Sequence, residues 1–200
     1  MSAAPISAPT ATRKSAGARR ELVLAAATRA FAEQGYAATT TDTVAREAGV
    51  SQPYVVRMFG TKLQLFVEVF EHAAERIIEA FERELDSQPF DPEEPDDWTR
   101  LGHAYKELVV DRDFLLVMLH GFTSAGVDEI GVAARACMGR IFALLRRTGG
   151  SDEQLRVFVA HGMLINVLVA MRAPEHLGEG GPLADLMACA MQEFRPPAAT

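Results

Sequence analysis

Cysteine is scarce in this sequence. The chain has 200 residues and only two cysteines, Cys137 and Cys189, which lie 52 positions apart. Small secreted domains that depend on disulfides carry several closely spaced cysteines, and many zinc and redox sites use CxxC pairs. The sequence therefore excludes a disulfide framework, and we expect a reduced, intracellular protein.

Long apolar runs are also missing. The longest uncharged interior stretches cover residues 114–127 and 157–171, which are 14 and 15 residues long, whereas a membrane-spanning helix needs about 20 predominantly apolar residues. The first 12 residues are rich in alanine, serine, proline and threonine, and they lack the basic start and apolar centre of a secretory signal. We expect a cytoplasmic protein without membrane contacts, and a disordered tail over residues 1–16.

Motifs for catalysis are absent as well. The five histidines include no pair three or four residues apart, and HExxH, GxSxG, GxGxxG and GxxxxGK[ST] do not occur. We therefore predict that the protein is not an enzyme and uses neither a metal nor another cofactor. A helical enzyme whose catalytic groups come together only in the folded chain is an alternative.

The sequence does have helical periodicity. Strand patterns and Asn-Gly or Asp-Gly turns are lacking, while apolar residues recur three and four positions apart through most of the chain. We predict an all-α protein of about nine helices, whose ends are marked by glycine, proline and capping side chains. With their capping residues, the expected ranges are about 17–34, 40–48, 51–58, 61–88, 96–109, 111–125, 128–148, 151–172 and 183–194.

Two short helices around Gly49 form a helix-turn-helix candidate. Ala45 is small where the two helices would cross, and Gly49 can adopt the left-handed conformation of a tight turn. Val50 and Val55 can pack beneath the turn. In such units the second helix enters the DNA major groove, but two short helices around a glycine also occur in proteins that never bind DNA.

A more specific pattern runs through about residues 19–70. In chain order it consists of RELVLAAA at 20–27, FAEQGY at 31–36, TTT at 39–41, VAREAGVS at 44–51 and FGTK at 59–62. This ordered combination resembles the DNA-binding domain of TetR-type transcriptional regulators. The resemblance implies an all-helical homodimer with a three-helix reading head over residues 17–63 and a larger ligand-binding and dimerisation domain over residues 64–200. It also implies a repressor that leaves a palindromic double-stranded DNA operator when a small-molecule effector binds.

The resemblance assigns roles within the reading head. Thr40, Thr41 and Lys62 match the family's phosphate-contacting positions at helix N-termini, where exposed N–H groups favour anions. Gln52 and Arg57 would face the major groove, because an amide can pair with adenine and a guanidinium with guanine. The predicted DNA-binding residues are Thr40, Thr41, Ser51, Gln52, Pro53, Tyr54, Arg57 and Lys62.

One position departs from the family pattern. Val56 stands where the family usually has an aromatic that contacts a phosphate, and the aromatic is displaced to Tyr54. The operator preference of relatives therefore does not transfer to this chain. A basic arm that follows the DNA backbone or enters the minor groove would consist of Arg13, Lys14, Arg19 and Arg20.

Net charge alone argues against DNA binding, because the chain carries 27 acidic and 20 basic residues and a formal charge of −7. The charges are unevenly divided, however. Residues 1–70 hold 8 basic and 5 acidic side chains, whereas residues 71–200 hold 12 and 22. The basic excess therefore lies in the reading head and the acidity in the larger domain, which is compatible with binding through a few placed contacts.

The larger domain is expected to hold an apolar effector cavity and the dimer interface. The candidate cavity residues are Trp98, Tyr105, Phe114, Met118, Phe122, Met138, Phe142 and Asn166, and His120 could add a polar contact. The segment 151–172 is apolar over more than one face, as a helix buried against a partner would be. Candidate dimer contacts are Phe158, Gly162, Ile165, Leu183, Leu186, Met187 and Met191.

Asn166 is the one amide in that apolar run, and it could fix the dimer register, bind the ligand or be a satisfied core residue. A further alternative for the whole protein is a DNA-binding adaptor without a ligand. Such an adaptor would recruit another protein through the acidic loop at residues 91–97.

Overall fold

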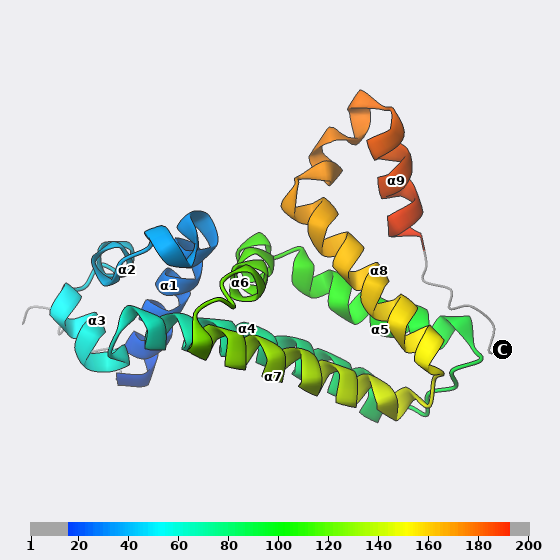
Figure 1. Cartoon of the computed structure of the whole chain (residues 1–200), viewed down its shortest axis with the longest axis horizontal. Coiled ribbons are helices and arrows are strands. Elements are labelled where there is room, and N and C mark those ends of the chain that lie inside the picture. Colours follow the sequence, from blue (N-terminus) through cyan, green and yellow to red (C-terminus); the bar gives the residue numbers. More distant parts are fainter. Residues whose placement is uncertain (1–15, 193–200) are drawn as a thin grey trace, which may run out of the picture.

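The computed structural model describes residues 16–192. The predicted tail therefore lies outside the described residues except for Ala16, and so do Arg13 and Lys14 of the predicted arm. Within residues 16–192 the chain forms helices and no strand, which confirms the predicted all-α class. Figure 1 shows a reading head of three helices at one end, joined to a larger helical body.

The reading head consists of α1 (Ala16–Ala38), α2 (Thr41–Ala48) and α3 (Gln52–Phe59). Gly35 breaks α1 with φ 72° and ψ 173°, at the predicted stop, and a last turn follows the kink. The buried Thr39 hydroxyl donates to the carbonyl oxygens of Ala30 at 3.1 Å and Gly35 at 2.7 Å. These bonds, with the Thr39 backbone N–H bond to the Gly35 carbonyl oxygen, fix Thr39 against the end of α1.

Gly49 forms the turn between α2 and α3. It adopts the left-handed conformation with φ 65° and ψ 34°, and its backbone N–H donates to carbonyl oxygens at the end of α2. The Thr40 hydroxyl caps the other end of α2 by accepting a hydrogen bond of 3.1 Å from the Thr43 backbone N–H. Val55 is buried as predicted, Val50 is only partly buried against the core, and Val44 is buried as well.

The long helix α4 (Lys62–Ser87) connects the head to the body. Thr61 and Gln64 form a capping box at its start, which satisfies two otherwise free N–H groups. Its buried face packs against α1 in the head and against α5 (Pro95–Val109), α6 (Arg112–Thr123) and α7 (Asp128–Leu145) in the body. Figure 1 shows α4 and α7 side by side along the length of the body.

The last part of the chain forms a helical hairpin. A 3-10 turn, η1 (Arg146–Thr148), leads to α8 (Asp152–Ala170), and α9 (Pro182–Met191) turns back and packs against the C-terminal part of α8. The segment between the two helices contains the 3-10 helix η2 (Ala173–Glu179). The hairpin has its own small apolar cluster of Leu168, Ala173, Met187 and Ala190.

One apolar core extends from the head into the body. The Phe31 ring of α1 makes an edge contact with Phe66 of α4 at 4.9 Å between centroids, and Tyr36 lies 5.1 Å from the same ring. Buried residues from α1 to α8 belong to one continuous cluster. The core therefore crosses the predicted boundary between residues 63 and 64, and helices of the body support the reading head directly.

Candidate nucleic-acid interface and internal pocket

Helix α3 presents one face outward because the opposite face is anchored. Val55 and Phe59 are buried against the core, while Pro53, Val56 and Arg57 are exposed. Ser51 occupies the N-cap position, as predicted, but its side chain makes no capping hydrogen bond. Its exposed hydroxyl is therefore not committed to the helix end.

Gln52 and Thr41 lie against each other. The Gln52 amide Nε2 donates to the Thr41 hydroxyl oxygen at 3.1 Å, which joins the first turn of α3 to the first turn of α2. Two of the predicted DNA-binding side chains thus come together at neighbouring helix starts. A groove contact by the Gln52 amide nitrogen would have to replace or share this hydrogen bond.

Tyr54 and Arg57 form a second pair on α3. The Arg57 guanidinium carbon lies 5.1 Å from the centroid of the Tyr54 ring, and the half-buried ring packs against the core. The cation–π contact and the i, i+3 spacing hold the guanidinium over a fixed surface. Arg57 is therefore a pre-positioned cation on the outward face.

Lys62 lies in a different environment from the one expected for a phosphate contact. Its ammonium donates to the carbonyl oxygens of Tyr36 at 2.9 Å and Ala37 at 3.2 Å, and it lies 4.5 Å from the centroid of the Tyr36 ring. The carbonyls at the end of α1 attract a cation. An ammonium has three donors, so one hydrogen is left for a phosphate, and that role stays a prediction.

Arg20 was expected in a basic arm, but the structure places it on helix α1 with its side chain partly exposed. Its guanidinium pairs with Glu68 of α4 and lies 4.9 Å from the centroid of the Phe59 ring. These contacts tie α1 to α3 and α4, so the arm assignment of Arg20 is wrong for this conformation. Arg19 is exposed on α1.

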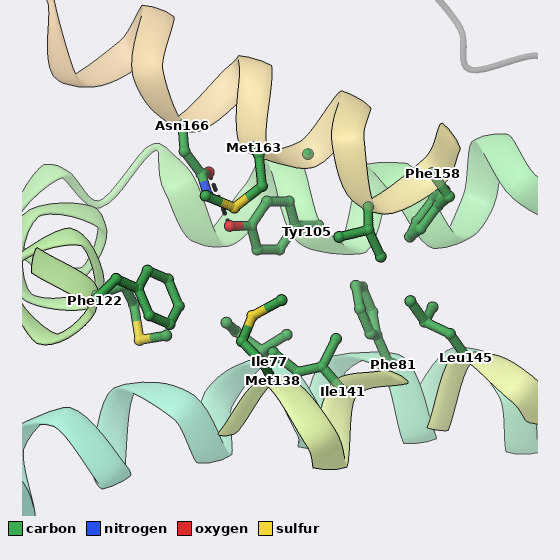
Figure 2. Close-up of a pocket in the computed structure, with 13 residues that line it drawn as sticks. Ile77, Phe81, Tyr105, Phe122, Met138, Ile141, Leu145, Phe158, Met163 and Asn166 are labelled. Atoms are coloured by element: carbon green, nitrogen blue, oxygen red, sulfur yellow. Dashed lines mark hydrogen bonds between the residues drawn. The ribbon is translucent and has the colours of Figure 1, made fainter. Parts of the chain in front are cut away.

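The body contains an apolar pocket between five helices. Its cavity volume is about 60 Å³, below the roughly 300–1,000 Å³ of known small-molecule sites, so a ligand of that size would have to displace lining side chains. Figure 2 shows α8 on one side, α4 and α7 on the other, and Phe122 of α6 at one end. The described lining residues are Ile77, Phe81, Tyr105, Met118, Phe122, Met138, Ile141, Leu145, Phe158, Val159, Gly162, Met163 and Asn166.

Five of the eight predicted cavity residues line this pocket: Tyr105, Met118, Phe122, Met138 and Asn166. Phe158 and Gly162, expected at the dimer interface, line it too. Ile77 and Phe81 of α4 also line the pocket and were not among the predicted residues, although the apolar repeat every four residues along α4 marked its buried face. That repeat does not tell core from cavity.

Three predicted cavity residues lie elsewhere. Trp98 is buried between Phe90 and Phe158, and its indole N–H donates to the Pro92 carbonyl oxygen at 2.9 Å, so it anchors the loop before α5. Phe114 lies beneath the Arg76 guanidinium, 4.7 Å away, on the side facing α1. Phe142 lies on the outer face of α7 beside Arg146.

His120 also points away from the pocket. Its Nε2 lies 3.2 Å from the Ala32 carbonyl oxygen in α1, so the predicted polar contact with a ligand is wrong for this conformation. Met118 and Phe122, two positions before and after His120, occupy the face of α6 that lines the pocket. His120 therefore lies on another face of this helix. The histidine consequently contacts the reading head.

A single pair of polar side chains contacts the pocket among the described lining residues. The Tyr105 hydroxyl donates to Asn166 Oδ1 at 2.8 Å, and Asn166 Nδ2 lies 3.8 Å from the Met163 sulfur (Figure 2). Burial raises the pKa of Tyr105 to about 12, against the opposing effect of the Asn166 hydrogen bond. The phenol is therefore neutral at physiological pH, and the described lining carries no formal charge.

The predicted dimer contacts divide into two groups. Leu183, Leu186 and Met191 are exposed on α9, but Phe158, Ile165 and Met187 are buried within the chain. The buried three pack against α5 or inside the α8–α9 hairpin, so they are not available to a partner in this conformation. Met163 and Val167 of α8 and Met171 at its C-terminal cap are exposed apolar residues, and Val167 and Met171 were not among the predicted contacts.

Comparison with known proteins agrees with this geometry. Residues 23–69 match the family model described as bacterial regulatory proteins, tetR family. The HTH-type transcriptional activator FasR of Mycolicibacterium smegmatis is 25% identical over 153 residues, which cover 73% of this chain and 67% of that protein.

Solved structures share the fold. A TetR-like transcriptional regulator from Rhodococcus aligns with a TM-score of 0.61 at 18% identity, covering 89% of this chain and 94% of that one. The fatty acid degradation regulator FadR from Bacillus halodurans aligns with a TM-score of 0.61 at 17% identity, covering 87% and 93%. The family-model match over residues 23–69, together with the helix-turn-helix head, identifies the DNA-binding domain of a TetR-family transcriptional regulator.

Proposed function

We propose that this protein is a homodimeric repressor that binds a palindromic operator through α3 of each subunit and leaves it when an apolar effector fills the internal pocket. The observation that carries the DNA-binding surface is α3 itself. Val55 and Phe59 fix the helix to the core, and the Tyr54 ring holds Arg57 on the outward face. A guanidinium in this position suits bidentate pairing with guanine.

The two reading heads would be joined through α8 and α9. Their exposed apolar side chains form a surface that a second copy can bury, made of Met163, Val167, Met171, Leu183, Leu186 and Met191. Among the described helices, α8 alone is long and apolar enough to cross a membrane, with a mean hydropathy of 1.2. Helices α6 and α7 are long and apolar enough only when taken together, and the pair is bent by 116°. We favour a protein partner because the exposed apolar surface of α8 continues onto the shorter helix α9.

Coupling between pocket and DNA would pass through α4 and α6. Both helices line the pocket and both contact the head, α4 through Phe66 and α6 through His120. An effector can act only if it binds one arrangement of these helices better than the other. We propose that pocket filling moves the heads away from the roughly 34–36 Å spacing that successive major grooves require.

Selection of bound sequences from random DNA tests the operator. A palindrome with half-sites about one helical turn apart is expected, and a single half-site bound by one chain would contradict the dimer. Apolar compounds that raise the melting temperature should release that operator from the unaltered protein but not from Val159→Trp, whose larger side chain would fill the pocket. A reporter gene then decides the sign of regulation, because the mycolicibacterial relative is named as an activator.

Head spacing has its own measurement. A spin label at Arg46→Cys, in a background that replaces the exposed Cys189 by serine, reports the distance between the two heads by pulsed paramagnetic resonance. Equal distances in the free, effector-bound and operator-bound dimers would exclude the proposed movement.

The adaptor alternative gains no support from the acidic loop. Asp97 accepts a hydrogen bond of 2.7 Å from the Asp91 backbone N–H and pairs with Arg100, and Asp91 accepts one from the Glu93 backbone N–H. These bonds shape the loop internally. A structural role therefore accounts for two of its acidic side chains without a protein partner.

A further inference from the structure

The polar atoms of the internal pocket are few and unequally satisfied. Eleven of the thirteen described lining residues are apolar, and the other two are Tyr105 and Asn166. Asn166 is only 3% exposed. An amide in such a place needs partners for both its oxygen and its nitrogen, because a buried polar group without a partner is costly.

The orientation of the amide follows from its neighbours. Oδ1 accepts from the Tyr105 hydroxyl, and Nδ2 faces the Met163 sulfur at 3.8 Å. A thioether can accept a hydrogen bond but cannot donate one, so the reverse orientation would leave Oδ1 facing a sulfur without a hydrogen. The strong acceptor of the amide is therefore satisfied, and its donor has only a weak sulfur acceptor.

We propose that the effector is an apolar molecule with one uncharged hydrogen-bond acceptor, such as the carbonyl oxygen of an ester, ketone or amide, which accepts from Asn166 Nδ2. This inference rests on the proposed role of the pocket as the effector site. The incoming oxygen replaces the Met163 sulfur as the partner of Nδ2, while the Tyr105 bond to Oδ1 stays in place and fixes the amide.

The same lining rejects a charged group. A carboxylate that enters an apolar pocket loses its hydration, and only a cation or several donors can replace it. None of the described lining residues is lysine, arginine or histidine. The Tyr105 hydrogen is already donated to Asn166, so one amide nitrogen would be left to stabilise the whole negative charge.

A chain-matched series of ligands tests the assignment. Methyl decanoate, decanoate and decane are titrated into the full-length protein at pH 7.5 by calorimetry, and we expect the ester to bind at least tenfold more tightly than the other two. In Asn166→Leu the ester should lose this advantage over decane. In Val159→Ala, a matched change in the apolar lining, all three ligands should weaken alike and the preference should persist.

Tyr105→Phe provides a second variant in case Asn166→Leu does not fold. It removes the hydroxyl but keeps the amide donor, so the ester should remain preferred over decanoate. Equal binding of ester and decane, or tighter binding of decanoate, would overturn the head-group assignment and leave the pocket intact. If none of the three ligands binds, both the head-group assignment and the proposed role of the pocket as the effector site are overturned. Ester binding that does not release operator DNA would contradict the proposed regulation alone.

Discussion

His120 of α6 lies 3.2 Å from the Ala32 carbonyl oxygen of α1, measured from Nε2. The same imidazole packs against Gly35, where a Cβ would lie 3.2 Å from Cε1. Two residues before and after His120, Met118 and Phe122 line the internal pocket. One helix therefore lines the internal pocket with one face and contacts the end of α1 with another.

Replacing Gly35 by alanine should destabilise the protein. Its φ of 72° with ψ of 173° is reached comfortably by glycine alone, and other residues there cost about 1–3 kcal/mol. The new methyl group would also displace the His120 ring. Urea unfolding should show this loss, whereas Gly139→Ala, in a helix with open space around it, should be neutral or stabilising. Equal stability of the two variants would contradict the strain at Gly35.

Replacing Arg57 by alanine should reduce sequence discrimination. If the guanidinium pairs with one base, the loss is about 1–3 kcal/mol on the selected operator and specificity relaxes at one position. Fluorescence anisotropy on the operator and its single-base variants measures both effects. Arg46→Ala, which removes an exposed partner of Asp42 on α2, serves as the control and should leave base preference unchanged. A loss for Arg57→Ala that is equal on operator and random DNA would refute base readout.

Replacing Lys62 by methionine should lower stability as well as DNA affinity. The substitution keeps the aliphatic stem but removes two hydrogen bonds from the ammonium to the end of α1. A hydrogen bond to a charged group contributes up to about 3 kcal/mol to stability. Thermal and urea unfolding should show a loss, and Arg19→Met on the exposed side of α1 should not. Unchanged stability with uniformly weaker DNA binding would assign Lys62 to phosphate contact alone.

Introducing a charge on α9 should separate the subunits. Leu186 is exposed on the apolar surface proposed for dimerisation, and an aspartate there would bury an unpaired charge on association. Sedimentation should show Leu186→Asp as a monomer with weakened operator binding. Val110 is 83% exposed between α5 and α6, and Val110→Asp should remain dimeric. A dimeric Leu186→Asp would place the interface elsewhere.

Tyr105 predicts a loss of stability in alkali. Burial raises its pKa from 10.0 to about 12, so the contribution is complete below pH 10 and is lost as the pH rises towards 12. A shift of this size corresponds to roughly 2–3 kcal/mol. Burial also raises the pKa of Cys137 to about 11, so the comparison uses Cys137→Ala as background. Unfolding of Tyr105→Phe in that background should depend less on pH between 10 and 12.

The helix ends of this protein were predictable because they depend on local chemistry. Gly35, Gly49 and Thr61 act through positive φ values or side-chain caps within a few residues along the chain. Those interactions are present in the sequence itself. The order and the approximate bounds of the helices followed from them.

The partners of individual side chains were harder to predict because they come from distant parts of the chain. Lys62 binds carbonyl groups 25 and 26 residues earlier, and Phe114 and Phe142 lie on helix faces that periodicity alone does not assign to core, cavity or surface. The same limitation applies to Phe158, which was expected at a subunit interface and lines the pocket. Packing between helices decides these positions.

The shared core of head and body limits how this regulator can be recombined with its relatives. A chimera that takes residues 17–63 from another protein would set a foreign α1 against Phe66 and His120, which belong to α4 and α6. In such a chimera, the DNA specificity and the packing of the head against α4 and α6 would change together. The exchangeable unit is therefore larger than the DNA-binding segment, and α4 and α6 must be transferred or redesigned with it.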